Sequence, residues 1–251
     1  MRYFLHLSYN GTNFCGWQIQ PNEPSIQENL ETAFSHLLRE KIGITGCGRT
    51  DTGVHALNYY AHFDYKELQK NEIEELVFKL NRYFGFDIKV LGLFKMKPDA
   101  HARFDAGSRT YKYYIANKKQ PFNNDFSHYY SRHLNIEKMN EACQKLISYT
   151  DFTSFSKLHT QVNNNNCTVF SAYWEKEGDM LVFTIEANRF LRNMVRSIVG
   201  TLVEVGIEKI SISEFCEIIE AKDRARAGAS FPAKALFLDN IKYDKELFLP
   251  I

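Results

Sequence analysis

The most noticeable absence from this sequence is an excess of charge of either sign. Its 251 residues carry 31 Lys and Arg against 30 Asp and Glu, a formal net charge of +1. Nucleic-acid-binding domains commonly have a marked basic excess, so any such surface on this chain has to be local. The apolar share of 44% is that of a folded globular protein, and the length suffices for one large domain or two smaller ones.

Cysteine pairs and long apolar runs are also missing. The five cysteines are scattered with no C-x-x-C spacing, a pattern typical of reduced thiols rather than of a disulfide framework or a zinc site. No apolar run reaches membrane-spanning length, and the N-terminal residues alternate like a strand instead of forming a charged-then-apolar leader. We therefore expect a cytoplasmic protein with no membrane segment.

The candidate site is residues 48–56, which read Gly-Arg-Thr-Asp-Thr-Gly-Val-His-Ala. The runs before and after it are rich in β-branched and aromatic residues, which predicts a strand, a tight turn and a second strand. Gly48 and Gly53 bracket Arg49 and Asp51, and glycine permits positive φ or the close approach of a ligand. Taken alone, an aspartate between glycines is more often a turn cap than a catalytic group.

This loop resembles the catalytic loop of the tRNA pseudouridine synthase A (TruA) family, with Thr52 where that family usually has alanine. The resemblance implies that Asp51 is the nucleophile of uridine isomerisation. The reaction breaks the N1–C1′ glycosidic bond and rejoins the base through C5, so it needs no cofactor and no metal. An ionised carboxylate can attack either C1′ of the ribose or C6 of the base. The sequence does not distinguish between these two sites of attack. A buried carboxylate stays ionised only beside a cation.

Residues 95–119 are the one extended basic segment, with seven basic residues against two acidic ones. Within it, residues 109–114 alternate as a strand, which places Arg109, Tyr111 and Tyr113 on one face. Basic residues interleaved with tyrosines suit unpaired bases and phosphates. An exposed strand with ordinary aromatic packing fits the composition equally well. The strand resembles the family's Arg-x-Tyr-x-Tyr motif, which implies that Tyr111 packs on the target uracil.

A second arginine-rich stretch covers residues 189–200. Arg189, Arg192 and Arg196 stand at i, i+3 and i+7, which predicts one face of a helix. A solvated arginine stripe is the common interpretation of such spacing. However, Phe-Leu-x-x-Met-Val-Arg-x-x-Val-Gly resembles another signature of the family. That resemblance implies that Arg196 is the cation that meets Asp51.

The resemblance also assigns roles to residues around these motifs. Arg49, Tyr111 and Arg196 are expected to bind the substrate uridine, whereas the residues expected to contact tRNA elsewhere are Arg109, Lys112, Arg189 and Arg192. Besides Thr52, three positions depart from the family pattern: Asn10, Phe231 and Ala235. The polar run 163–166 has no role that the sequence defines.

Hydrophobic periodicity predicts helices over residues 25–38, 66–84, 136–149 and 212–221. The two strand-like runs around Gly178 predict a hairpin. We place a domain boundary at the connector near residues 105–107, which divides the chain into 1–106 and 107–251. The fold that the family resemblance implies is α+β. In it, two ferredoxin-like or RRM-like halves join into a continuous, mostly antiparallel sheet, with helices on one face and a catalytic cleft between the halves.

The expected function is therefore pseudouridine formation in the anticodon stem-loop of tRNA, at positions 38, 39 and 40 by family resemblance, by a homodimer. Which tRNAs are used is not encoded in any motif. A non-catalytic RNA-binding protein on the same fold is the alternative, although it would not need both Asp51 and Arg196. A carboxylate glycosylase would need a second acid, which the sequence near Asp51 lacks but which folding could supply from elsewhere in the chain.

Overall fold

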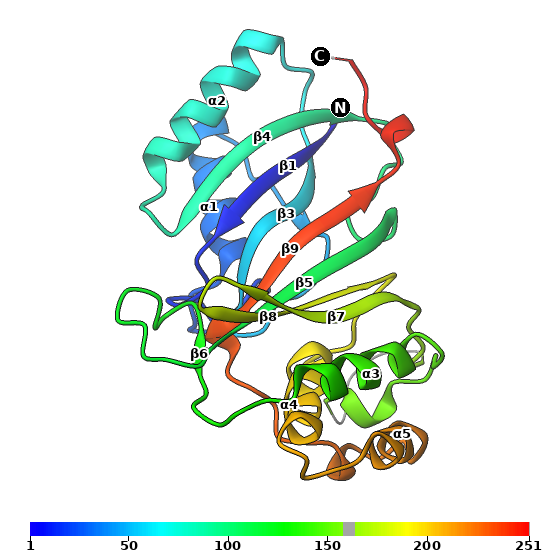
Figure 1. The fold of residues 1–251 in the computed structure, drawn as a ribbon. Helices are drawn as coiled ribbons and strands as arrows, with labels where there is room; N and C mark the ends of the chain where they lie inside the picture. The colour runs from blue at the N-terminus through cyan, green and yellow to red at the C-terminus, as the bar shows by residue number, and fades with distance from the viewer. Residues whose placement is uncertain (158–163, 251) are drawn as a thin grey trace. The chain divides into compact units, whose positions relative to one another are not determined.

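The computed structural model describes residues 1–157 and 164–250, which form the expected α+β fold (Figure 1). Asn163, the first residue of the polar run, lies outside the described residues. The strands and helices are β1 (Arg2–Tyr9), α1 (Ile26–Leu38), β2 (Thr45–Gly46), β3 (His55–Asp64), α2 (Lys70–Tyr83), β4 (Ile88–Met96), β5 (Ala106–Ala116), β6 (His128–Tyr129), α3 (Ile136–Leu146), β7 (Val169–Glu177), β8 (Met180–Ala187), α4 (Met194–Gly206), α5 (Ile212–Glu220) and β9 (Leu236–Tyr243).

The chain divides into two compact units, Met1–Gly107 with Leu238–Ile251, and Ser108–Phe237. The second unit thus ends before the C-terminus, whereas the sequence-based boundary placed all of 107–251 in one half. Aromatic packing explains the return of the chain to the first unit. The ring of Phe4 lies 5.1 Å from that of Tyr243 and 6.3 Å from that of Phe248.

The first unit contains the strand order β4-β1-β3-β9, with β1 antiparallel to both β3 and β4. Helices α1 and α2 pack together and cover the same face of these strands (Figure 1). Alternate residues of β1 point into this core, where Tyr3 and Leu5 are fully buried with Phe34 of α1. The alternation of β1 therefore gives one face to the helices and the other, with Phe4, to the C-terminal segment.

The second unit contains β5-β8-β7, paired antiparallel, with the short β6 parallel to β5. Strands β7 and β8 form the predicted hairpin, whose turn holds Gly178 at φ 60°. Helix α3 packs on β7 and on α4, which also contacts α5. Helix α4 is buried on almost every side, because its sequence is apolar all round.

The helices begin where side chains satisfy their first backbone N–H groups. Ser25 caps α1 by accepting from the N–H of Glu28 at 3.2 Å, as the sequence predicts. Helix α2 begins at Lys70, four residues later than predicted. The hydroxyl of Tyr3 explains the difference, since it accepts from the N–H of Leu68 at 2.7 Å and donates to the carbonyl of Lys66. These backbone groups are thereby withdrawn from helical hydrogen bonding.

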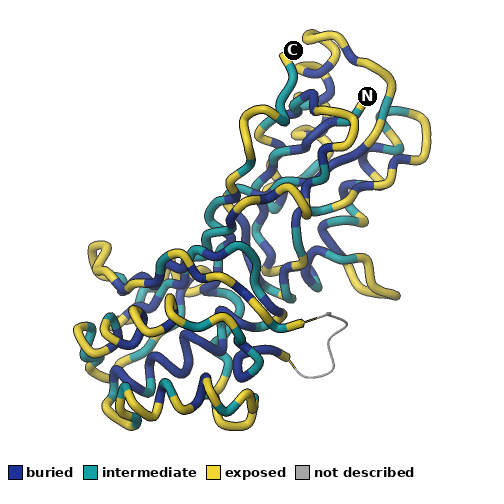
Figure 2. Tube along the Cα trace, turned by 90° about the vertical axis from the view of Figure 1, so that its right-hand side faces the viewer, coloured by how far each residue is buried: buried dark blue, intermediate teal, exposed yellow. Residues whose placement is uncertain are grey.

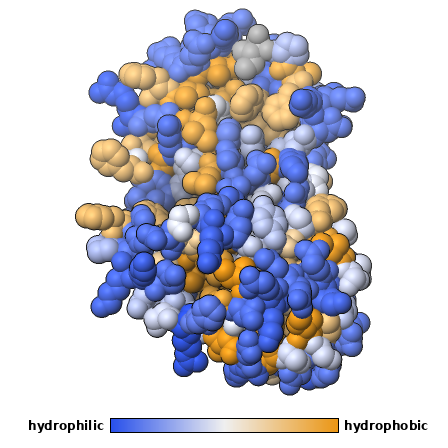
Figure 3. Space-filling view, in the orientation of Figure 1, coloured by the Kyte–Doolittle hydropathy of each residue, from blue (hydrophilic) through white to orange (hydrophobic). Residues whose placement is uncertain are grey.

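Burial follows the two units. Figure 2 shows buried residues running through the interior of each unit and exposed ones gathered at turns and outer helix faces. On the face drawn in Figure 3, hydrophilic and hydrophobic residues are interspersed. Several large apolar side chains are largely exposed, namely Phe78, Phe86, Phe104 and Phe122. Among residues 1–157 and 164–250, no helix has the length and apolar character needed to cross a membrane.

Candidate active site

The candidate catalytic loop follows the two-residue strand β2 and leads directly into β3. Its Asp51 is partly exposed and Arg49 is exposed, whereas Thr50 between them is buried. The carbonyl of Asp51 accepts from the N–H of Val54 at 3.1 Å, so the carboxylate stands at the start of a turn. Gly53 has φ 76° within that turn, a conformation that favours glycine. Gly48 has no such requirement, and a Cβ there would meet open space.

Two buried phenols hold this loop, one through a side chain and one through the backbone. The hydroxyls of Tyr9 and Thr50 share a hydrogen bond of 2.9 Å, and the hydroxyl of Tyr59 donates to the carbonyl of Gly48. The ring of Tyr59 stacks on Trp17 with centroids 4.1 Å apart. Burial raises the pKa of Tyr59 well above its ordinary value, so this phenol remains a proton donor.

A second stretch of chain, residues 11–17, lies against the loop. The N–H of Trp17 donates to the carbonyl of Thr50 at 3.3 Å, and the N–H of Gly53 donates to the carbonyl of Phe14 at 3.3 Å. Gly16 has φ 87°, and a Cβ on it would overlap the carbonyl oxygen of Thr50. Trp17 itself is 2% exposed and packs against Tyr59, so it is a core residue. The loop that carries Asp51 is therefore bonded on both sides of that residue.

The family departure at position 10 has a local explanation. The side-chain oxygen of Asn10 accepts from the N–H of Thr12 at 3.1 Å and from its hydroxyl at 2.7 Å. This Asx turn needs only an acceptor oxygen, which an amide supplies as well as a carboxylate does. Asn10 is thus compatible with the chain path that brings residues 11–17 to the catalytic loop.

In the second unit, β5 carries Tyr111, the tyrosine predicted to pack on the target uracil. Tyr111 is partly exposed, and its ring lies edge-on to Phe190 with centroids 5.0 Å apart. The guanidinium of Arg109 donates to the carbonyl of Asn188 at 2.7 Å. Tyr113 shares their strand face but is fully buried, with its hydroxyl on the carbonyl of Pro232 at 2.9 Å. Only the first part of this strand face is therefore accessible.

The opposite face of β5 carries Lys112, which forms an ion pair of 3.1 Å with Glu177. Both side chains are partly exposed. An exposed pair of this kind contributes little to stability.

The three arginines do not share one helix face, so that prediction is wrong. Helix α4 begins at Met194, and Arg189 and Arg192 precede it. Asn193 causes the break, because its φ of 67° is left-handed and cannot continue a helix in the N-terminal direction. Arg192 is exposed, while Arg196 lies in the first turn of α4.

Residues 227–231 form a strap across the first half of α4. Arg196 donates through Nε to the carbonyl of Phe231 at 2.6 Å, and the N–H of Phe231 returns to the carbonyl of Arg196 at 3.1 Å. The guanidinium of Arg224 donates to the carbonyls of Ala227 and Gly228, both at 3.2 Å. Arg224, which lies in the segment after α5, therefore holds the strap together through its backbone carbonyls. The sequence gives no indication of that role, since Arg224 lies among other charged residues of the kind usually found on a protein surface.

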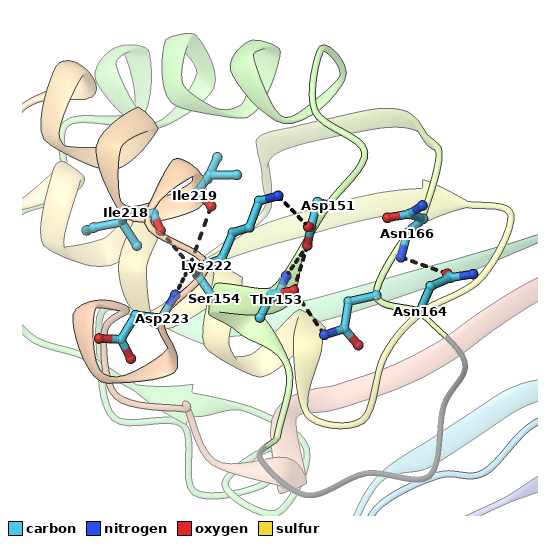
Figure 4. Close-up of polar contacts among 10 residues, drawn as sticks. Asp151, Thr153, Ser154, Asn164, Asn166, Ile218, Ile219, Lys222 and Asp223 are labelled. Atoms are coloured by element: carbon cyan, nitrogen blue, oxygen red, sulfur yellow. Dashed lines mark hydrogen bonds and ion pairs between the residues drawn. The ribbon is translucent and has the colours of Figure 1, made fainter.

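The Asp-Phe-Thr-Ser motif at residues 151–154 anchors another part of this unit (Figure 4). Asp151 accepts from the hydroxyl of Thr153 at 2.6 Å and pairs with Lys222 at 3.0 Å. Burial opposes ionisation here, but these contacts together lower the pKa of Asp151. The hydroxyl of Ser154 donates to the carbonyl of Ile218 at 2.6 Å. The motif thus fastens the end of α5 and serves packing.

The structure groups the predicted residues by unit. Asp51 and Arg49 share the catalytic loop, whereas Arg109, Tyr111 and the segment before α4 are in direct contact within the second unit. The pairing of Asp51 with Arg196 joins residues of different units and stays a prediction. Among the described residues, no group of three His, Cys, Asp or Glu side chains is arranged to hold a metal ion.

Comparison with known proteins matches residues 142–244 to a family described as tRNA pseudouridine synthase. The chain is 54% identical over 250 residues to tRNA pseudouridine synthase A of Parabacteroides distasonis, covering 98% of each chain. It is 52% identical over 248 residues to the Bacteroides fragilis protein of that name, again covering 98% of each. The Clostridium acetobutylicum protein of that name is 39% identical over 241 residues, 95% of this chain and 98% of the relative.

Proposed function

Because the chain belongs to the tRNA pseudouridine synthase family, we propose that it isomerises uridine to pseudouridine in tRNA with Asp51 as its nucleophile. The observation that carries this assignment is that the loop presents an accessible carboxylate on a firmly held backbone. Its carboxylate is partly exposed to incoming substrate, while the residues beside it are fixed by buried hydroxyls. Reactive groups on a loop held by a rigid scaffold are a common arrangement in enzymes.

The reaction balances without any added reagent. When the Asp51 carboxylate attacks C1′, the N1–C1′ bond breaks and its electron pair stays on the uracil. The base turns, C5 bonds to C1′, and the carboxylate leaves. C5 then loses its proton and N1 gains one, so the product is an isomer of the substrate. Attack at C6 followed by the same transfer gives the same balance.

Arg49 and Tyr111 supply the contacts that this chemistry needs. A uridine inside a stacked stem has to be flipped out, which costs a few kcal/mol. The exposed guanidinium of Arg49, two residues from Asp51, suits a role in filling the vacated space and binding phosphate. The partly exposed ring of Tyr111 suits stacking on the base, which is worth about 1–3 kcal/mol.

The tRNA itself is proposed to meet basic residues of the second unit. Arg192 is exposed, and Arg109, Lys112 and Arg189 are partly exposed. Such contacts position the substrate through its phosphates. We place the modified uridines at positions 38, 39 and 40 of the anticodon stem-loop and the enzyme in the cytoplasm, where tRNA is its substrate. We further propose that the protein acts as a homodimer, as the resemblance to the family implies.

Release of tritium from tRNA labelled at uridine C5 tests this function. Isomerisation expels the C5 hydrogen into water, whereas a protein that only binds tRNA releases none. We expect release from a tRNA with uridines at positions 38, 39 and 40, and none when all three are replaced by cytidine. Undiminished release from the replaced tRNA would contradict the proposed positions, and no release from either would contradict the proposed reaction.

A further inference from the structure

The residues on either side of Arg49 are each held by a tyrosine that lies beneath the catalytic loop. Tyr59 is fully buried and donates to the carbonyl of Gly48. Tyr9 is 4% exposed and shares its hydrogen bond with the hydroxyl of Thr50. These two anchor points are two residues apart, and Asp51 follows the second directly. Neither phenol is needed by the chemistry proposed above.

The two phenols form one packed group with Trp17. The ring of Tyr9 lies 5.5 Å from that of Tyr59 and 6.5 Å from that of Trp17. A Cβ on Gly46, in β2, would lie 2.5 Å from Cε2 of Trp17 and would also overlap the hydroxyl of Tyr59. The rings of Trp17 and Tyr59 therefore pack directly against the backbone of Gly46, in the strand that leads into the loop. Close packing of this kind transmits a small displacement instead of absorbing it.

We propose that Tyr9 and Tyr59 are positioning residues that set where the Asp51 carboxylate stands relative to the bound uridine. The proposal rests on Asp51 being the nucleophile. Each hydroxyl fixes a loop atom next to the reacting group, Tyr9 through the side chain of Thr50 and Tyr59 through the carbonyl of Gly48. Loss of either hydroxyl leaves the aromatic stack in place but frees one anchor of the loop.

The alternative is that these hydroxyls only stabilise the fold, and Tyr3 provides a matched control for it. Tyr3 is also fully buried in the first unit, and its hydroxyl also bonds backbone, accepting from the N–H of Leu68 at 2.7 Å. That backbone leads into α2 and not into the catalytic loop. Tyr3→Phe therefore removes a comparable buried hydrogen bond without touching an anchor of Asp51.

The test compares Tyr9→Phe, Tyr59→Phe and Tyr3→Phe in the full chain, with single-turnover rate, tRNA affinity and urea midpoint measured for each. A displacement of about 1 Å in a catalytic group can cost about a hundredfold in rate. We expect both loop variants to lose tenfold or more in rate, with tRNA affinity within about twofold of wild type. Tyr3→Phe is expected to lower the urea midpoint similarly while keeping a rate within about twofold of wild type.

Thr50→Val supplies the same test from the loop side, since it keeps the shape of the side chain and removes its hydroxyl. We expect it to reproduce the rate loss of Tyr9→Phe, and the double variant to be no slower than either single one, because both remove the same bond. If Tyr59→Phe fails to fold, Tyr9→Phe and Thr50→Val decide alone.

Three outcomes overturn the proposal: loop variants with rates within about twofold of wild type, rates no lower than that of Tyr3→Phe, or additive losses in the Tyr9–Thr50 pair. Asp51→Asn separates this failure from failure of the proposed function. If Asp51→Asn is inactive and the tyrosine variants are fully active, only the positioning role is excluded. An active Asp51→Asn removes the nucleophile on which the positioning role depends.

Discussion

At the scale of single residues, the hydroxyl of Tyr111 is the group whose role is most open to experiment. Re-forming the bond through C5 leaves a proton there, and a phenol near it can help accept that proton. On this account Tyr111→Phe is nearly as slow as Tyr111→Ala, with tRNA binding largely intact. Single-turnover rates of both variants make the measurement. A Phe variant with full turnover would leave Tyr111 with stacking alone.

Arg192 and Arg196 form a natural pair for comparison, because one is exposed before α4 and the other lies in its first turn. We expect Arg196→Met to lower kcat, because the proposed pairing with Arg196 would keep the Asp51 carboxylate charged once bound uridine excludes water. Arg192→Met is expected to raise KM and leave kcat near wild type, as loss of a phosphate contact does. Steady-state kinetics at neutral pH measure both. Wild-type kinetics for Arg196→Met would remove it as the partner of Asp51.

At the scale of elements, the glycines around the loop separate structural need from substrate contact. Gly16→Ala forces a Cβ onto the carbonyl of Thr50 from a left-handed backbone, so it should lower the urea midpoint by the equivalent of about 1–3 kcal/mol. Gly48→Ala meets open space and should leave the midpoint unchanged. Urea titration of both variants makes the comparison.

The activity of Gly48→Ala then tests whether the substrate contacts the backbone at this position. A stable but inactive variant indicates that substrate approaches this backbone closely, which is the remaining reason for a glycine there. Equal destabilisation of the two variants would show that the loop is not held as described.

Hydrophobic spacing predicted most of these elements correctly, because helix and strand periods depend on local sequence. The errors occur where distant side chains bind the backbone. The strand expected before the loop shrinks to Thr45–Gly46, since Gln27 and Glu31 of α1 bond the carbonyl and N–H of Ile44. The helix expected to carry the three arginines is shorter for a different and local reason, the left-handed conformation of Asn193.

The candidate site was predictable to the extent that its motifs are contiguous. Asp51 and Arg49 stand in one recognisable loop, and the structure places them there. The anchors of that loop were not predictable, because Tyr9 and Tyr59 come from two strands and look like ordinary core aromatics. Their hydroxyl contacts depend on strand register, which pairs Leu7 with Tyr59 and Tyr9 with Ala56.

At the scale of the whole molecule, buried histidines are expected to make stability depend on pH between about pH 6.5 and 4. Burial, with the charges of Arg2 and His101 beside it, lowers the pKa of His62 to about 4. Its Nδ1 accepts from the N–H of Ala102 at 3.1 Å, a bond that protonation removes. The unfolded chain takes up this proton near pH 6.5, whereas the folded chain does not until about pH 4. Stability should therefore fall as pH falls through this window.

Urea midpoints from pH 8 to pH 4 measure this dependence. We expect the midpoint of His62→Gln to fall less steeply than that of wild type between about pH 6.5 and 4, because its amide does not titrate. The slope should shrink without vanishing, since burial also lowers the pKa of His6 and His128. Parallel curves for the two proteins would exclude His62 as a contributor.

The central claim is that Asp51 performs the chemistry, and Asp51→Asn tests it most directly. Asparagine is nearly isosteric with aspartate but carries no charge and is a poor nucleophile. The measurement is single-turnover pseudouridine formation in tRNA, with tRNA affinity and circular dichroism recorded on the same preparations. The account predicts no detectable pseudouridine, unchanged affinity and an unchanged spectrum. Turnover by the variant within about tenfold of wild type would contradict it, because loss of a covalent catalyst costs far more than that.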